Sequence, residues 1–107
     1  MKFIFLGKYS KAGFTGFVNT PSQDLKSIIS SMLEKAGGTL DELFLTRGVY
    51  VVVVIGLANE FETVGAIKMV IMSTGAFDEA TILEKTDFNK IANKASEISS
   101  FYKSPKS

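Results

Sequence analysis

The stretch TLDELFLTRGVYVVVVIGL, residues 39–57, contains two apolar runs separated by Arg47-Gly48. A glycine between two runs rich in apolar and β-branched residues is typical of a β-hairpin, because glycine adopts the backbone angles of a tight turn. The first run carries Asp41 and Glu42, as an edge strand does. In the second run both sets of alternating positions are apolar, so both faces of that strand are apolar. The sequence therefore predicts an edge strand, a tight turn at Arg47-Gly48 and a central strand that is covered on both faces.

Segments on either side of this hairpin show the periods of further strands and helices. The first and last strands are expected at 2–8 and 76–85, around the hairpin strands 39–47 and 49–57. The glycines of residues 9–16 predict a flexible loop.

Three stretches have apolar residues spaced three and four apart, as an amphipathic helix requires. The first, 20–36, begins with the capping signals Thr20 and Pro21 and ends at Gly37-Gly38. The second is expected at 59–74 with Asn59 as its cap. The third opens at Thr86-Asp87, carries Phe88, Ile91, Ala92, Ala95, Ile98 and Phe101 on one face, and precedes a frayed tail at 103–107.

This order of elements is β-α-β-β-α-β with an added C-terminal helix, within one domain spanning residues 1–107. It predicts an α+β fold of the ferredoxin-like type, with an antiparallel sheet in the order 4-1-3-2. The two intervening helices of such a unit lie on the same face of the sheet, yet strands 2–8 and 49–57 are apolar on both faces. The other face must be covered either by a second copy of the chain, which we favour, or by the C-terminal helix folding under the sheet.

Composition excludes several classes of function. The chain has no cysteine and no histidine, which removes disulfides, the usual metal ligands and nucleophile–histidine catalysis. A net charge of +1 supplies no field to attract nucleic acid or an anionic membrane. The longest apolar run, 49–58, is roughly half of a membrane span, and the apolar start is too short for an export signal. We expect a cytoplasmic protein without metal or organic cofactor.

Three stretches resemble the GYD-domain family of small prokaryotic proteins: FLGKYS at 5–10, Gly37-Gly38, and above all FLTRGVYVVV at 44–53. The likeness covers roughly residues 1–95. Gly48 and Tyr50 match the Gly-x-Tyr-Asp stretch that names the family, and Val51 stands where the aspartate would be. The resemblance implies a dimeric α/β-barrel type of assembly. Its better-known relatives are effector-binding domains of leucine-responsive regulators and cofactor-independent monooxygenases.

Arg47, the only arginine, is the first candidate site residue, with Tyr50 close by and Lys8 and Tyr9 at the end of the first strand. A guanidinium beside a phenol can hold the carboxylate of a small acidic or aromatic metabolite. A solvated turn residue or an intersubunit salt bridge explains Arg47 equally well. Three functions stay open: a homodimer, or an assembly of dimers, that binds such a metabolite; a cofactor-independent monooxygenase-like enzyme; and a purely structural oligomerisation module.

Overall fold

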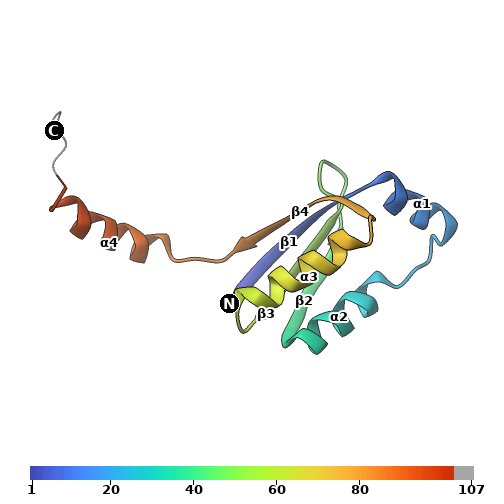
Figure 1. The fold of residues 1–107 in the computed structure, drawn as a ribbon, viewed down its shortest axis with the longest axis horizontal. Coiled ribbons are helices and arrows are strands. Elements are labelled where there is room, and N and C mark those ends of the chain that lie inside the picture. The colour runs from blue at the N-terminus through green and yellow to red at the C-terminus, as the bar shows by residue number, and fades with distance from the viewer. Residues whose placement is uncertain (103–107) are drawn as a thin grey trace.

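A computed structural model of the chain describes residues 1–102, and the frayed tail expected at 103–107 lies outside this range. The described residues form four strands and four helices, coloured along the chain in Figure 1. In chain order they are β1 (Lys2–Tyr9), α1 (Lys11–Asn19), α2 (Leu25–Ala36), β2 (Gly38–Leu45), β3 (Val52–Ala58), α3 (Phe61–Ser73), β4 (Phe77–Glu84) and α4 (Phe88–Ser99).

All neighbouring strands of the sheet are antiparallel, and their spatial order is β2-β3-β1-β4. Read from the other edge, this is the predicted order 4-1-3-2, and the ferredoxin-like α+β fold is confirmed. Strands β1 and β3 occupy the centre, where Phe5 lies opposite Val54 on one side and Ile82 on the other.

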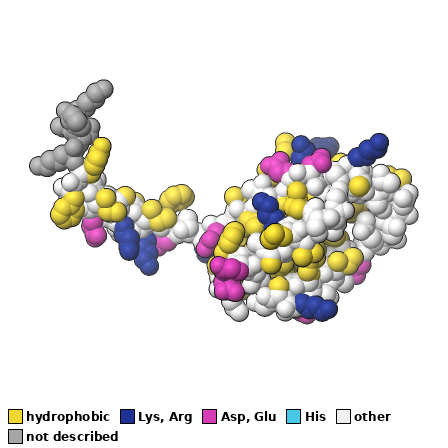
Figure 2. Space-filling view, viewed as in Figure 1, with side chains coloured by type: hydrophobic (Ala, Val, Ile, Leu, Met, Phe, Trp, Pro, Cys, Tyr) yellow, Lys and Arg dark blue, Asp and Glu magenta, His cyan; other side chains and the backbone are white. Residues whose placement is uncertain are grey.

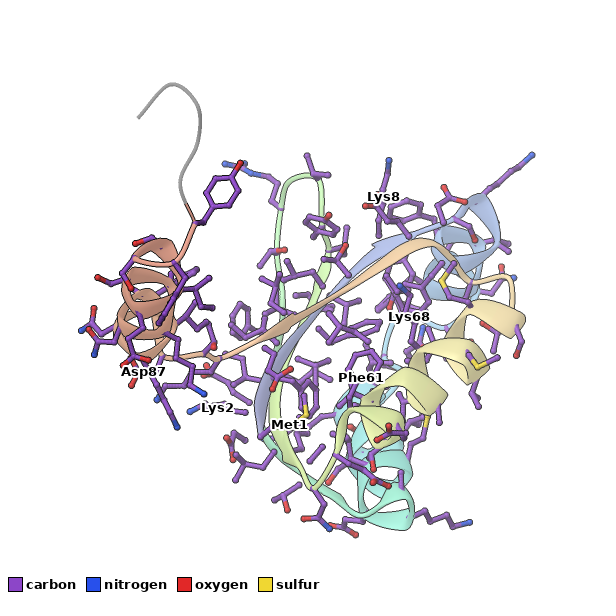
Figure 3. All side chains as sticks on the ribbon, turned by 60° about the vertical axis from the view of Figure 1, so that its left-hand side comes forward. Met1, Lys2, Lys8, Phe61, Lys68 and Asp87 are labelled. Atoms are coloured by element: carbon purple, nitrogen blue, oxygen red, sulfur yellow. The ribbon has the colours of Figure 1, made fainter. Side chains whose placement is uncertain are left out.

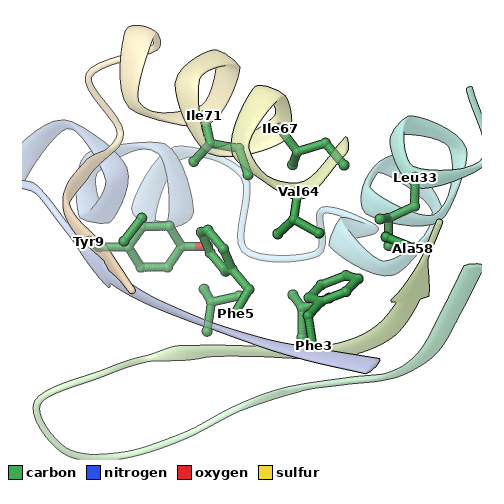
Figure 4. Close-up of a cluster of buried hydrophobic side chains, with 11 residues drawn as sticks. Phe3, Phe5, Tyr9, Leu33, Ala58, Val64, Ile67 and Ile71 are labelled. Atoms are coloured by element: carbon green, nitrogen blue, oxygen red, sulfur yellow. The ribbon is translucent and has the colours of Figure 1, made fainter. Parts of the chain in front are cut away.

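The core lies between one face of the sheet and the helices α2 and α3 (Figure 4). Alternation along each strand decides which residues enter it. On β1 the core residues are Phe3, Phe5 and Tyr9, and on β3 they are Val52, Val54 and Ala58. They meet four helical side chains, Leu33, Val64, Ile67 and Ile71.

The alternate residues of the same strands point to the opposite side of the sheet, which we call the open face. Its centre is formed by Ile4, Leu6, Val53 and Ile55, which are only half-buried. The register places Phe44, Thr81 and Leu83 beside them on the outer strands. The predicted central position of β1 and β3 is confirmed, whereas no element within residues 1–102 covers their second face, and its cover stays a prediction.

The segment expected to be a flexible glycine loop is instead the helix α1. Ser10 caps it, because its side-chain oxygen accepts a hydrogen bond from the Gly13 backbone N–H, 3.2 Å away. Gly13 lies against the start of β4, where any Cβ would collide with the carbonyl oxygen of Ala76. This glycine serves close packing rather than flexibility.

Two predicted helix starts were wrong. Helix α2 begins at Leu25 rather than near Thr20, because Asp24 is the better cap: its carboxylate accepts from the backbone N–H and the hydroxyl of Ser27, at 3.1 and 2.7 Å. Helix α3 is preceded by Glu60, which makes no side-chain capping bond, rather than capped by Asn59. The predicted end of α2 is confirmed, since Gly37 adopts the left-handed conformation with φ +93°.

The turn at Arg47-Gly48 is wider than predicted. Strand β2 ends at Leu45 and β3 begins at Val52, so six residues, 46–51, form the connection. Gly48 has φ +145°, a backbone angle that favours glycine. The strand pairing does not continue up to a tight turn, and hydrogen bonds within the loop take its place.

Helix α4 stands clear of the rest of the molecule, joined to β4 by a short segment (Figure 1). Asp87 caps it as predicted, accepting from the Lys90 backbone N–H at 3.1 Å. The chain has a radius of gyration of 18.3 Å, whereas a compact domain of this length has about 13 Å. In this structure α4 does not fold under its own sheet, and Phe101 lies beyond its end.

Candidate functional site

The loop 46–51 is anchored to the sheet by its backbone. The Thr46 N–H donates to the Val51 carbonyl at 2.7 Å, and the Thr46 hydroxyl donates to the Tyr50 carbonyl at 2.6 Å. The Val51 N–H in turn donates to the carbonyl of Gly7 on β1, at 2.9 Å. These bonds hold the backbone of Tyr50 beside the central strand.

Tyr50 reaches across the open face. Its hydroxyl lies 3.2 Å from a carboxylate oxygen of Glu79, to which it donates, and 3.2 Å from the hydroxyl of Thr81. Both partners belong to β4, and β1 lies between β3 and β4. The phenol side chain therefore bridges β1, where Leu6 and Lys8 are the register partners of Thr81 and Glu79.

Lys8 and Tyr50 thus lie at the same end of the open face. Figure 3 shows Lys8 at this end and Lys2 at the other end of β1. Lys8 is exposed, as is its cross-strand partner Glu79. Arg47 is exposed in the anchored loop, three residues before Tyr50. An aromatic ring, one lysine and one carboxylate therefore border an apolar surface, and Arg47 stands exposed in the adjoining loop; a ring with a cation beside it suits an aromatic or acidic small molecule.

Tyr9 is not part of this group, because alternation along β1 turns it to the opposite face. It is 6% exposed and packs edge-on against Phe17 at 5.4 Å and in a tilted arrangement on Phe77 at 4.8 Å between ring centroids. Burial raises the pKa of its hydroxyl. Tyr9 is a core residue that joins α1 to the sheet.

Glu79 and Thr81 were not among the site residues that the sequence suggested. Alternation within 76–85 places both on one face. Their meeting with Tyr50 depends on the pairing of β1 with β4, and no local signal in the sequence states that register.

A hollow lies at the other end of the open face, with a volume of about 410 Å³. Its floor is apolar, formed by Ile4 and Ile55, and four charged residues surround it: Lys2, Asp41, Glu42 and Lys85. Lys2 and Asp41 approach to 4.0 Å across its rim. We call this feature the outer hollow.

Within residues 1–102 no three acidic side chains come close enough together to hold a metal ion. The helices of the same range are all too short or too polar to span a membrane.

Comparison with known proteins gives one match. The family model described as the GYD domain matches residues 3–93. No curated protein and no solved structure matches the chain. The match includes the anchored loop, Tyr50, Lys8 and all four strands.

Proposed function

This chain belongs to the GYD-domain family, and on that premise we propose that it is a self-associating domain that binds a small aromatic acid on its open face. The proposal that a ligand binds there rests on one observation: Tyr50 reaches across β1 to Glu79 and Thr81. Its phenol ring therefore lies over an apolar strand with Lys8 beside it. The proposal requires neither a metal ion nor an organic cofactor.

The surface of the molecule supports self-association. The chain exposes 7664 Å², whereas a compact monomer of its mass exposes about 5,800 Å². The open face adds Phe44, Leu57 and Leu83, each more than a third exposed, to its half-buried centre. A stable interface removes roughly 800 Å² from each partner, about the area that one face of a four-stranded sheet offers. A second copy is the partner that is always present at matching concentration.

The charges around Tyr50 support a ligand of a particular orientation. Because Glu79 already accepts a hydrogen bond from the Tyr50 hydroxyl, a second anion there would be repelled. The carboxylate of a ligand would instead lie toward Arg47 and Lys8, and its ring would pack on the phenol of Tyr50. An aromatic acid satisfies both conditions, whereas a dianion or a neutral sugar satisfies only one or neither.

A thermal-shift panel tests this function, using benzoate, phenylacetate and hydroxybenzoates with their neutral amides as controls. We expect the acids to raise Tm and the amides to have little effect. One charge-assisted pair contributes about 1.5–3 kcal/mol, so Arg47→Ala should weaken binding of the best acid roughly tenfold to a hundredfold.

The matched control is Lys26→Ala. Lys26 is an exposed residue of α2, so this variant also removes one positive charge, but at a position far from the open face. It should bind the acid as the parent does. Equal binding by Arg47→Ala and the parent would contradict the assignment of Arg47. If no acid raises Tm while the chain self-associates, the structural alternative replaces the ligand-binding one.

A further inference from the structure

Helix α4 has an apolar side that no other helix or strand of residues 1–102 covers. No residue of α4 is buried, and three of its large side chains, Phe88, Ile91 and Ile98, are 76%, 49% and 66% exposed. Figure 2 shows hydrophobic side chains gathered along this helix, which projects from the body of the molecule. At helical spacing they form one stripe with Ala92 and Ala95, while Asn89 and Asn93 occupy the other side. A helix of twelve residues is marginal in water unless it packs against something.

The chain's own sheet is poorly placed to receive this stripe. The Lys85 N–H still donates to the carbonyl of Lys2, at 2.9 Å, so the sheet pairing extends to residue 85. Only Thr86 and the cap Asp87 remain before α4 begins. Two residues reach about 7 Å when extended, which leaves little chain for a reversal onto the open face. A short connection of this kind favours docking on another copy.

We propose that α4 of one chain lies across the open face of a second copy, over the outer hollow, and that the two copies exchange their helices reciprocally. This inference rests on the self-association proposed above and names the element that produces it. The stripe of Ile91, Ala95 and Ile98 would contact the apolar floor formed by Ile4 and Ile55.

The dimensions of the two surfaces agree. A helix of twelve residues is about 18 Å long. Four strands spaced about 4.8 Å apart present a face of about the same width. The chain exposes roughly 1,800 Å² more than a compact monomer of its mass, and exchange of α4 would bury surface on the helix and on the sheet of each copy.

Charge distinguishes the open face from the other apolar surface of the molecule. A groove of about 230 Å³ between α2 and α3 is lined by Met32, Ala66, Ile67 and Val70, but the charged residue in its lining is Lys35. Helix α4 carries Lys94 beside its apolar stripe, so the lysine of this groove would repel it. The outer hollow has Asp41 and Glu42 in its lining, and either carboxylate can pair with Lys94 of a docked helix.

This arrangement covers one end of the open face and leaves the Tyr50 end accessible. The partner's helix would lie over Ile4 and Ile55, while Tyr50, Lys8 and Thr81 lie further along the same strands. The docked helix would then form one wall of the proposed ligand site.

A matched pair of variants tests the inference by light scattering coupled to size exclusion. Ile91→Asp places a charge in the stripe, whereas Asn93→Asp adds the same charge on the opposite side of the same helix. We expect Ile91→Asp to raise the dimer dissociation constant by at least about tenfold and Asn93→Asp to leave it unchanged. Because Ile91 makes no core contact within its chain, circular dichroism should show the sheet intact in both variants.

Cross-linking identifies where α4 docks. The chain has no natural cysteine, so single variants Ile55→Cys and Ala95→Cys can be mixed and treated with a short bismaleimide. A covalent dimer is expected from this mixture, and not when Asn93→Cys replaces Ala95→Cys. A cross-link confined to single chains of an Ile55→Cys, Ala95→Cys double variant would overturn the inference in favour of helix closure on its own sheet.

The outcomes separate this inference from the proposed function. If Ile91→Asp remains as dimeric as the parent, α4 is not the exchanged element, although self-association stands. If the parent chain is monomeric at micromolar concentration, both the self-association and the exchange fail. Ligand binding is measured independently of either result.

Discussion

At the scale of single residues, the two glycines of α1 show how one residue type serves two purposes. Gly13 has the carbonyl oxygen of Ala76 and the ring of Tyr9 where its side chain would be, while Gly16 has open space there. Both lie in the same helix, so both carry the same entropic cost relative to alanine. Packing alone distinguishes them.

Alanine substitutions at these two positions should therefore have opposite effects. Gly13→Ala forces apart α1, Tyr9 and the start of β4, and we expect a loss of about 1–3 kcal/mol in the free energy of unfolding. Gly16→Ala improves the helix propensity without a clash and should gain about 0.5–1 kcal/mol. Urea denaturation of both variants measures this, and a destabilised Gly16→Ala would refute the structural distinction.

Only part of the candidate site could be predicted from the sequence. Alternation along β1 is a local property, so the separation of Lys8 from Tyr9 was open to prediction, although their adjacency in sequence suggested one site. The bridge from Tyr50 to Glu79 and Thr81 could not be predicted. It joins residues 29 and 31 positions apart, and their meeting depends on the register of the whole sheet.

At the scale of elements, the strands were predicted better than the helix starts. Residues 49–57, for example, are rich in β-branched residues and form two alternating sets that face opposite sides. A strand accounts for both features, whereas a helix or a loop does not. Helix starts are decided by competition between nearby caps: Thr20-Pro21 and Asp24 both carry the signal, and Asp24 prevails through two bonds from Ser27. The predicted glycine loop failed because glycine composition indicates flexibility only where no close packing demands it.

The Asp24 cap predicts a pH dependence for α2. The hydrogen bond from the Ser27 hydroxyl, and then that from the Ser27 backbone, holds the pKa of Asp24 below its ordinary value. A carboxyl whose pKa is lowered by folding stabilises the protein above its unfolded pKa and loses that contribution as pH falls through the folded pKa. The difference in Tm between the parent and Asp24→Ala should therefore be largest near neutral pH and shrink at acidic pH.

Ser27→Ala is the companion variant for this measurement, because it removes the bond that lowers the pKa most. The pH dependence relative to Asp24→Ala should become weaker in the Ser27→Ala background. A difference between the parent and Asp24→Ala that stays constant from neutral to strongly acidic pH would argue against the cap as the cause.

At the scale of the whole molecule, the division between the two faces of the sheet governs everything that the chain presents to a partner. One face is closed by α1, α2 and α3, while the other keeps Ile4, Leu6, Val53 and Ile55 only half-buried. The sequence predicted this imbalance, because period two showed apolar residues on both sides of the central strands. The position of α4 could not be predicted. The pattern of an amphipathic helix shows that its apolar face needs a partner, but not whether that partner is the same chain or another one.

Adjacent valines of β3 test this division directly. Val53 lies on the open face next to Ile55, so Val53→Asp places a carboxylate in water in a single chain and against the edge of the docked α4 in the proposed dimer. We expect a folded monomer, because the cost arises only on association. Val52 is 1% exposed in the core, so Val52→Asp buries an unpaired charge within the chain and should abolish folding itself. Size exclusion with light scattering gives the mass, and circular dichroism reports the fold. A Val53→Asp chain that keeps the parent's oligomeric mass would show that the open face is not the surface through which the copies meet.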